Sequence, residues 1–183
     1  MKKERVFIVI DGSNFYYKLK GLGYKHLIKF DYLSFIKWIA RGRKISSSCF
    51  YIGQVREEPE NEKSKQLKRN QDRFLACLKN FGLEVKTGYI LKSDKEYHEK
   101  GVDVQIAVDI CMKAVRNEYD LLILISSDTD LIPAIKEVKK LAKKIEYVGF
   151  DFNPSFALIR FSDFRTLLKK EDLMPFTERK SAK

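Results

Sequence analysis

The sequence predicts an α/β protein: a three-layer α/β/α sandwich around a central, mostly parallel sheet of five or six strands. Strand-like segments alternate with segments of helical period along the chain. The connections between strands are long enough to hold helices, as parallel pairing requires. Two strand-like segments, residues 6–10 and 121–125, are apolar throughout, which is typical of strands buried on both faces. We therefore expect these two strands to be neighbours at the centre of the sheet.

The expected elements follow one another in regular order. Runs rich in β-branched and aromatic residues predict strands at 6–10, 49–55, 83–90, 121–126 and 145–150. Apolar residues three or four positions apart predict helices that include 35–40, 67–81, 104–115 and 131–142. The chain has no internal repeat and no linker rich in proline or glycine. We expect one domain over residues 1–177 and a disordered tail at 178–183.

The composition is that of a globular domain rather than a membrane protein. Of the 183 residues, 44% are hydrophobic, which is enough for a single packed core. The longest unbroken apolar stretches are five residues, whereas a membrane-spanning helix needs about 20. The first residues have neither the apolar core nor the cleavage site of a signal peptide. We expect a cytoplasmic protein that does not bind membranes.

Neither the cysteines nor the histidines indicate a site. Cys49, Cys77 and Cys111 lie far apart and form no C-x-x-C pair, so we expect reduced core residues. His26 and His98 are isolated from each other and from the cysteines, so the sequence does not indicate zinc.

The net charge favours polyanions as partners. Thirty-six Lys and Arg against 25 Asp and Glu give +11, which attracts nucleic acid. Basic surface charge also keeps proteins soluble, so the charge alone leaves both explanations open.

Acidic residues follow the two apolar strands. Asp11 comes directly after residues 6–10, and Asp128 and Asp130 follow 121–126. The carboxyl ends of parallel strands meet at one edge of a sheet, where functional crevices form. Asp, Ser and Thr also cap helices at such places, and Ser13 and Thr129 are candidates for that role. Capping does not explain several carboxylates side by side, whereas a Mg²⁺ or Mn²⁺ ion bound by oxygen ligands does.

Asp103 is the third residue expected in this acidic cluster. It opens the helix that follows the third strand, so its turn should lie at the same edge of the sheet. We expect it to share an inward face with Ala107, Ile110 and Ala114. An acidic residue in a first turn is also favoured by the helix dipole alone.

Two further acidic residues are secondary candidates. Asp109 lies roughly 9 Å beyond Asp103 along the helix axis, and Asp151 follows the last expected strand. Asp151 could be an outer ligand or a turn residue.

Three motifs carry a resemblance to a known family. They are D-G-S-N after the first strand, K-G-V-D-V-Q-I-A-V-D in the middle, and L-I-S-S-D-T-D-L-I-P-A-I later. In this order they resemble the NYN branch of the PIN-like nucleases, and within it the LabA-like group. The resemblance covers about residues 5 to 167. It implies a PIN-like fold and a phosphodiesterase that cuts RNA with Mg²⁺ or Mn²⁺, which we expect to be an endoribonuclease.

The resemblance also implies roles for individual residues. Asp11, Asp103 and Asp128 would bind the metal, and Asp130 would be a further catalytic acid. Asn14 would orient a ligand, water or phosphate. We also expect two other motif residues, Ser127 and Lys100, to position substrate or water.

Basic and aromatic residues near the motifs could hold RNA. Loop lysines before the middle motif and after the first one should border the crevice; they are Lys18, Lys20, Lys25, Lys92, Lys95 and Lys100. Tyr16, Tyr17 and Tyr24 could stack on unpaired bases, although core packing is an alternative for them.

Two other functions share parts of this sequence pattern. A phosphatase of the haloacid dehalogenase type needs a second Asp two residues after the first, where this chain has Ser13. A non-catalytic module that regulates RNA by binding, or by forming a homodimer, is the stronger alternative, because a carboxylate cluster can hold a metal without turning over substrate.

Overall fold

The protein is built on a seven-stranded sheet with the strand order β4-β3-β2-β1-β5-β6-β7. The computed structural model describes residues 3–24, 27–55, 57–58, 60–93 and 96–177. The strands are β1 (Arg5–Asp11), β2 (Lys44–Gln54), β3 (Glu84–Ser93), β4 (Glu96–Lys100), β5 (Leu121–Ile125), β6 (Lys144–Phe150) and β7 (Phe164–Leu168). Six strands are parallel, and β4 pairs antiparallel with β3.

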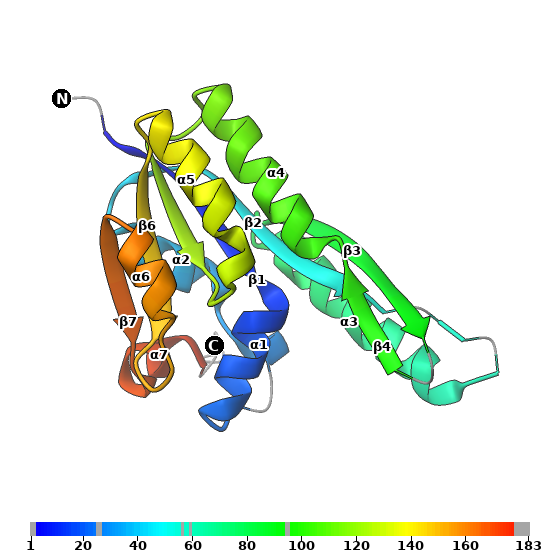
Figure 1. Ribbon diagram of the computed structural model, residues 1–183. Helices are drawn as coiled ribbons and strands as arrows, with labels where there is room; N and C mark the ends of the chain where they lie inside the picture. Colours follow the sequence, from blue (N-terminus) through cyan, green and yellow to red (C-terminus); the bar gives the residue numbers. More distant parts are fainter. Residues whose placement is uncertain (1–2, 25–26, 56, 59, 94–95, 178–183) are drawn as a thin grey trace.

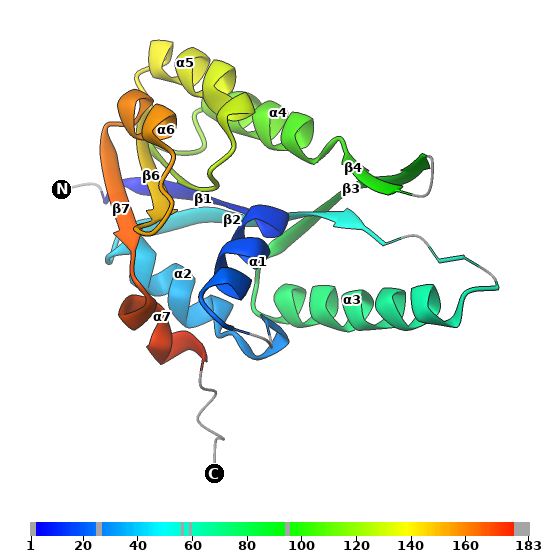
Figure 2. The same ribbon diagram turned by 60° about the horizontal axis from the view of Figure 1, so that its bottom comes forward.

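Helices cover both faces of the sheet, so the predicted three-layer architecture is confirmed (Figures 1 and 2). One layer holds α1 (Gly12–Gly21), α2 (Tyr32–Ala40), α3 (Glu62–Asn80) and α7 (Lys170–Thr177). The other holds α4 (Val102–Val115), α5 (Ile132–Lys140) and α6 (Phe156–Phe161). Two 3₁₀ turns, η1 (Leu27–Lys29) and η2 (Thr129–Leu131), complete the elements. In the described part of the chain, no helix has the length and hydropathy that a membrane span requires.

Strand β1 forms the centre of the core. It pairs in parallel with β2 on one side and β5 on the other, as expected for two apolar neighbours. Its side chains alternate between the layers, as the pleat of a strand requires. Ile8 and Ile10 pack toward α1, α2 and α3, whereas Phe7 and Val9 pack toward α4 and α5.

The sheet is larger than the apolar pattern indicates. Strand β4, with the sequence EYHEK, and the exposed start of β7 offer no apolar alternation, because both lie at edges of the sheet. β2 begins at Lys44 rather than at residue 49. Its first residues are mostly polar because β3 pairs with this strand only from Cys49 on, which leaves one side of the beginning free. Residues 178–183, expected to be a disordered tail, lie outside the described residues.

A buried carboxylate, Glu146, lies near the amino end of β6 and holds this strand to its neighbours. Glu146 is 0% exposed. Arg43 contacts it at 2.8 Å and Arg41 at 3.2 Å, and the Thr166 hydroxyl donates to it at 2.8 Å. These partners come from the end of α2 and from β7, so one side chain joins three elements.

We expect Glu146→Ala to lower the free energy of unfolding by about 3 kcal/mol, because it leaves the two arginines without their buried partner. Denaturant titration measures this. Glu137→Ala is the control, since Glu137 is 61% exposed and pairs with Lys140, and such surface pairs contribute up to about 1 kcal/mol. Equal effects of the two substitutions would contradict the prediction.

Candidate active site

Asp11 lies at the junction of β1 and α1 and is 5% exposed. Its Oδ1 accepts a hydrogen bond from the backbone N–H of Asn14 at 3.0 Å, which caps α1. Its Oδ2 accepts a hydrogen bond from the Ser126 hydroxyl at 2.7 Å. The side chain is therefore fixed by the first turn of α1 and by the residue that follows β5.

Ser126 connects Asp11 to Asp128. Its Oγ donates to Asp11 and accepts a hydrogen bond from the backbone N–H of Asp128 at 3.1 Å. Asp128 in turn caps η2, where its Oδ1 accepts from the N–H of Asp130 at 2.9 Å. The two predicted acids at the ends of β1 and β5 are thus brought together through one serine.

Ser126 was not among the predicted site residues, although the sequence holds a signal for it. The ladder between β1 and β5 aligns Ile10 with Ile125. In that register the next residues, Asp11 and Ser126, lie side by side. Pairing the two apolar strands end to end would have placed this hydroxyl beside the carboxylate.

Asp103 does not face inward as predicted. The buried stripe of α4 is formed by Val102, Ile106, Ile110 and Ala114, so the expected face is right in its second half and shifted by one residue in its first. Asp103 is exposed in the first turn. Helix α4 packs against η2, so this turn belongs to the same edge of the sheet as Asp130.

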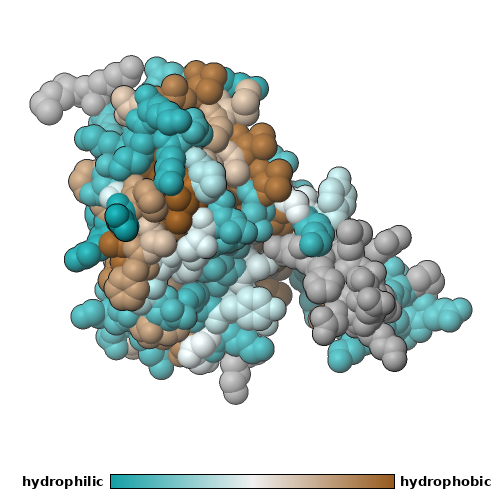
Figure 3. Space-filling view, in the orientation of Figure 1, coloured by the Kyte–Doolittle hydropathy of each residue, from teal (hydrophilic) through white to brown (hydrophobic). Residues whose placement is uncertain are grey.

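The outer side of α4 is also apolar. Val104, Val108, Met112 and Val115 recur at helical spacing and are 43–66% exposed. In Figure 3 apolar side chains gather along this helix. With apolar residues on two sides of the helix, the sequence could not identify which side faces the sheet.

A glycine on β3 sets the position of the first turn of α4. A Cβ added to Gly88 would lie 2.5 Å from Val102 Cγ2 and 2.6 Å from the carbonyl oxygen of Lys100. The backbone before Asp103 therefore packs directly on β3. Gly101 adds a left-handed conformation, with φ of 82°, that glycine adopts readily.

The other predicted positioning residues surround this edge. Asn14 is half-buried in the first turn of α1. Ser127 is half-buried, with its Oγ 3.4 Å from the Tyr147 hydroxyl. Asp130 is exposed in η2, and Lys100 is exposed at the end of β4.

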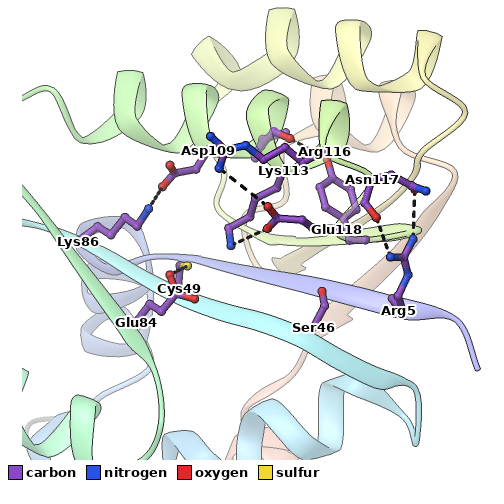
Figure 4. A network of polar contacts seen from close by, with 12 residues as sticks. Arg5, Ser46, Cys49, Glu84, Lys86, Asp109, Lys113, Arg116, Asn117 and Glu118 are labelled. Carbon is purple, nitrogen blue, oxygen red and sulfur yellow. Dashed lines mark hydrogen bonds and ion pairs between the residues drawn. The ribbon is translucent and has the colours of Figure 1, made fainter.

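Asp109 is paired with Lys86, as Figure 4 shows. Its carboxylate lies 2.8 Å from Lys86 Nζ and accepts a hydrogen bond from the Tyr51 hydroxyl at 2.8 Å. These contacts tie α4 to β2 and β3. Asp151 is exposed in the turn after β6.

The described residues contain no group of three or more His, Cys, Asp or Glu side chains placed to hold a metal ion. They do bring Asp11 and Asp128 together, but not a closed cluster with Asp103. His26 and the side chain of His98 lie outside the described residues. The three cysteines form no disulfide, and Cys49 is buried whereas Cys77 and Cys111 are partly exposed.

Several of the basic and aromatic candidates border the same edge. Lys18 Nζ donates to the carbonyl of Asn153 at 2.9 Å, and partial burial lowers the pKa of Lys18. Tyr16 and Tyr17 are exposed, whereas the Tyr24 hydroxyl donates to the Lys170 carbonyl at 3.2 Å. Lys20 is exposed; Lys25, Lys95 and the side chain of Lys92 lie outside the described residues.

We expect Gly88→Ala to lower the free energy of unfolding by about 1–3 kcal/mol, because backbone atoms occupy the space of the new Cβ. Chemical denaturation is the measurement. Gly21→Ala is the matched control, since a Cβ there meets its nearest atom at 3.8 Å. A Gly88→Ala protein as stable as the wild type would show that α4 is not held in this way.

We expect Ser126→Ala to cost about 1–3 kcal/mol of unfolding free energy, because it removes a buried donor from Asp11 and an acceptor from the Asp128 N–H. Ser127→Ala should cost less, about 0.5 kcal/mol, because it removes one long contact, 3.4 Å, to the Tyr147 hydroxyl. Both values come from urea titration of the purified variants. Similar losses for the two serines would argue against the bridging role of Ser126.

Comparison with known proteins places this arrangement in a family. The family model for the NYN domain matches residues 5–168. No curated protein matches the chain. A crystal structure of a protein of unknown function from Vibrio parahaemolyticus superposes with a TM-score of 0.72 at 24% identity, over 93% of this chain and 96% of that one; it supports the fold. The chain belongs to the NYN domain family, a branch of the PIN-like nuclease superfamily.

Proposed function

We propose that this NYN domain is a metal-dependent endoribonuclease that uses Mg²⁺ or Mn²⁺ at the edge formed by β1 and β5. The observation that carries the proposal is the bridge from Asp11 through Ser126 to Asp128. It links the Asp11 carboxylate to the backbone of Asp128, and the two acids follow adjacent central strands at the edge where open α/β sheets bind ligands.

The residues present fit a magnesium-like ion. Mg²⁺ keeps several waters and is often bound through one or two carboxylates together with substrate phosphates. Asp11 and Asp128 offer two carboxylates at one edge of the sheet, and carboxylates are the ligands such an ion takes from a protein. Asp11 and Asp128 would hold the ion, with Asp103 as a third ligand and Asp130 as a further acid beside it.

Such an ion supplies an activated water and stabilises charge on the phosphate oxygens. The protein fixes the positions of the carboxylates that would hold the ion. Asp11 and Asp128 are each fixed as a helix cap, so their carboxylates need little reorganisation. Asn14, Ser127 and Lys100 lie where they could orient water or a phosphate of the substrate.

RNA is the proposed substrate class, because the chain carries a net charge of +11 and polyanions are attracted to basic proteins. The placement within the LabA-like group stays a prediction.

A non-catalytic RNA- or protein-binding module is the second candidate. One observation favours it: Asp11 and Asp128 both serve as caps, so the fold gives them a role that needs no metal. The two functions predict different outcomes for one experiment.

We expect the purified protein to cut labelled single-stranded RNA with Mn²⁺ or Mg²⁺ and to stop when a chelator is added. The double variant Asp11→Asn/Asp128→Asn should lose on the order of a hundredfold in rate or more, while asparagine keeps the caps. DNA of the same sequence tests the preference for RNA.

Asp163→Asn is the matched control for this assay. Asp163 also accepts a backbone N–H, from Ile145 at 2.9 Å, but at the start of β6, on the opposite edge of the sheet. It should cut like the wild type. If the wild type binds RNA and cuts none with either metal, the binding-module function replaces the nuclease.

A further inference from the structure

A pocket of about 560 Å³ opens between α1, α3 and the end of β2. This volume is within the range of pockets that bind small molecules. The pocket includes Gly12, the residue directly after Asp11. It therefore adjoins the candidate active site through the first turn of α1.

That turn is pressed closely onto β2. A Cβ added to Gly12 would lie 2.3 Å from Phe50 Cε1 and 2.6 Å from the carbonyl oxygen of Tyr51. The pocket and Asp11 are thus fixed relative to each other by a backbone contact that only glycine permits.

The wall of the pocket that α3 forms is also held in place. Gln71 on α3 donates from Nε2 to the carbonyl of Gly53 at 2.7 Å and accepts from the Val55 N–H at 2.7 Å. Both contacts go to the end of β2. Helix α3 is therefore attached to the strand at the pocket itself.

Flat apolar surfaces line the pocket. Tyr16 on α1 is 43% exposed, and Phe74 on α3 is half-buried. Phe50 lies beneath them, with its ring centroid 5.6 Å from that of Phe74. At the rim, Lys29 is exposed and offers a positive charge.

The pocket also contains a polar group that lacks a partner. Tyr32 lines it and is 1% exposed, and among the described residues its hydroxyl has no hydrogen-bond partner. A buried hydroxyl of this kind is costly to leave unpaired. Burial raises the pKa of Tyr32, so the group remains a donor at physiological pH.

We propose that this pocket binds one unpaired nucleobase of RNA, with Tyr16 and Phe74 against its ring and the Tyr32 hydroxyl bonded to its edge. Proteins read single-stranded RNA by holding splayed bases on aromatic side chains and bonding to their edges. A base seated here would have its own phosphate beside Lys29 and the first turn of α1. The pocket would then select the nucleotide next to the cut, an inference that rests on the proposed function.

The first test measures binding without cleavage. Short fluorescein-labelled RNAs of A, C, G or U are titrated with the full chain in chelator and followed by anisotropy, beside a matched RNA with abasic riboses. We expect one base to bind best, and Tyr16→Ala to weaken that RNA on the order of tenfold while leaving the abasic RNA unchanged. Phe164→Ala is the control, because Phe164 is exposed to a similar degree, 47%, at the other edge of the sheet.

Tyr32→Phe separates binding from folding. It removes only the unpaired hydroxyl, so we expect a Tm no lower than that of the wild type, together with several-fold weaker binding of the preferred RNA. Tyr119→Phe is the opposite control, because the Tyr119 hydroxyl donates to the Ile110 carbonyl at 3.0 Å in the other layer. It should lower the Tm and leave RNA binding unchanged.

The outcomes distinguish this inference from the proposed function. If no RNA binds, or if Tyr16→Ala and Tyr32→Phe bind all RNAs like the wild type, the base pocket is refuted. If the variants behave as expected but no RNA is cut with either Mn²⁺ or Mg²⁺, the pocket stands and the nuclease proposal fails.

Discussion

The central position of β1 is the constraint on which the rest of the molecule depends. This strand is fully buried on both faces and hydrogen-bonded on both edges, by β2 and β5. All three strands run in the same direction, so their carboxyl ends share one edge. Asp11 is consequently buried where β1 stops, and it needs the Ser126 hydroxyl and the Asn14 N–H as donors. The acidic site is a direct result of how the core closes.

The junction between β1 and α1 also fixes the position of the pocket. Helix α1 must leave β1 at Gly12, and the lack of a side chain there lets the helix start against Phe50. Tyr16 then follows one turn later, facing α3 across the end of β2. Asp11 and Tyr16 therefore both belong to the start of α1. The backbone of this helix, rather than flexible side chains, sets the spacing between them.

The sequence predicted the parts whose structure depends on local pattern. The two apolar strands, their pairing and the acids at their ends could be inferred because burial on both faces leaves a clear signature. The edge strands β4 and β7 could not, since an edge has one side free and tolerates polar residues. The face of Asp103 was predicted wrongly because α4 is apolar on two sides. Tyr32 and Gln71 were not found at all, because the pocket they form depends on contacts between segments far apart in the chain.

The double duty of Asp11 and Asp128 has an evolutionary consequence. Each carboxylate stabilises the start of a helical turn, so selection for folding alone would retain both acids in a relative without nuclease activity. Their presence in a relative indicates that this edge is folded, and it says little about turnover. Asp103 and Asp130 are exposed, and the N-cap positions of their helices are held by Gly101 and Asp128. Substitution at these two positions, rather than at the buried acid, is where loss of chemistry would first become visible among related chains.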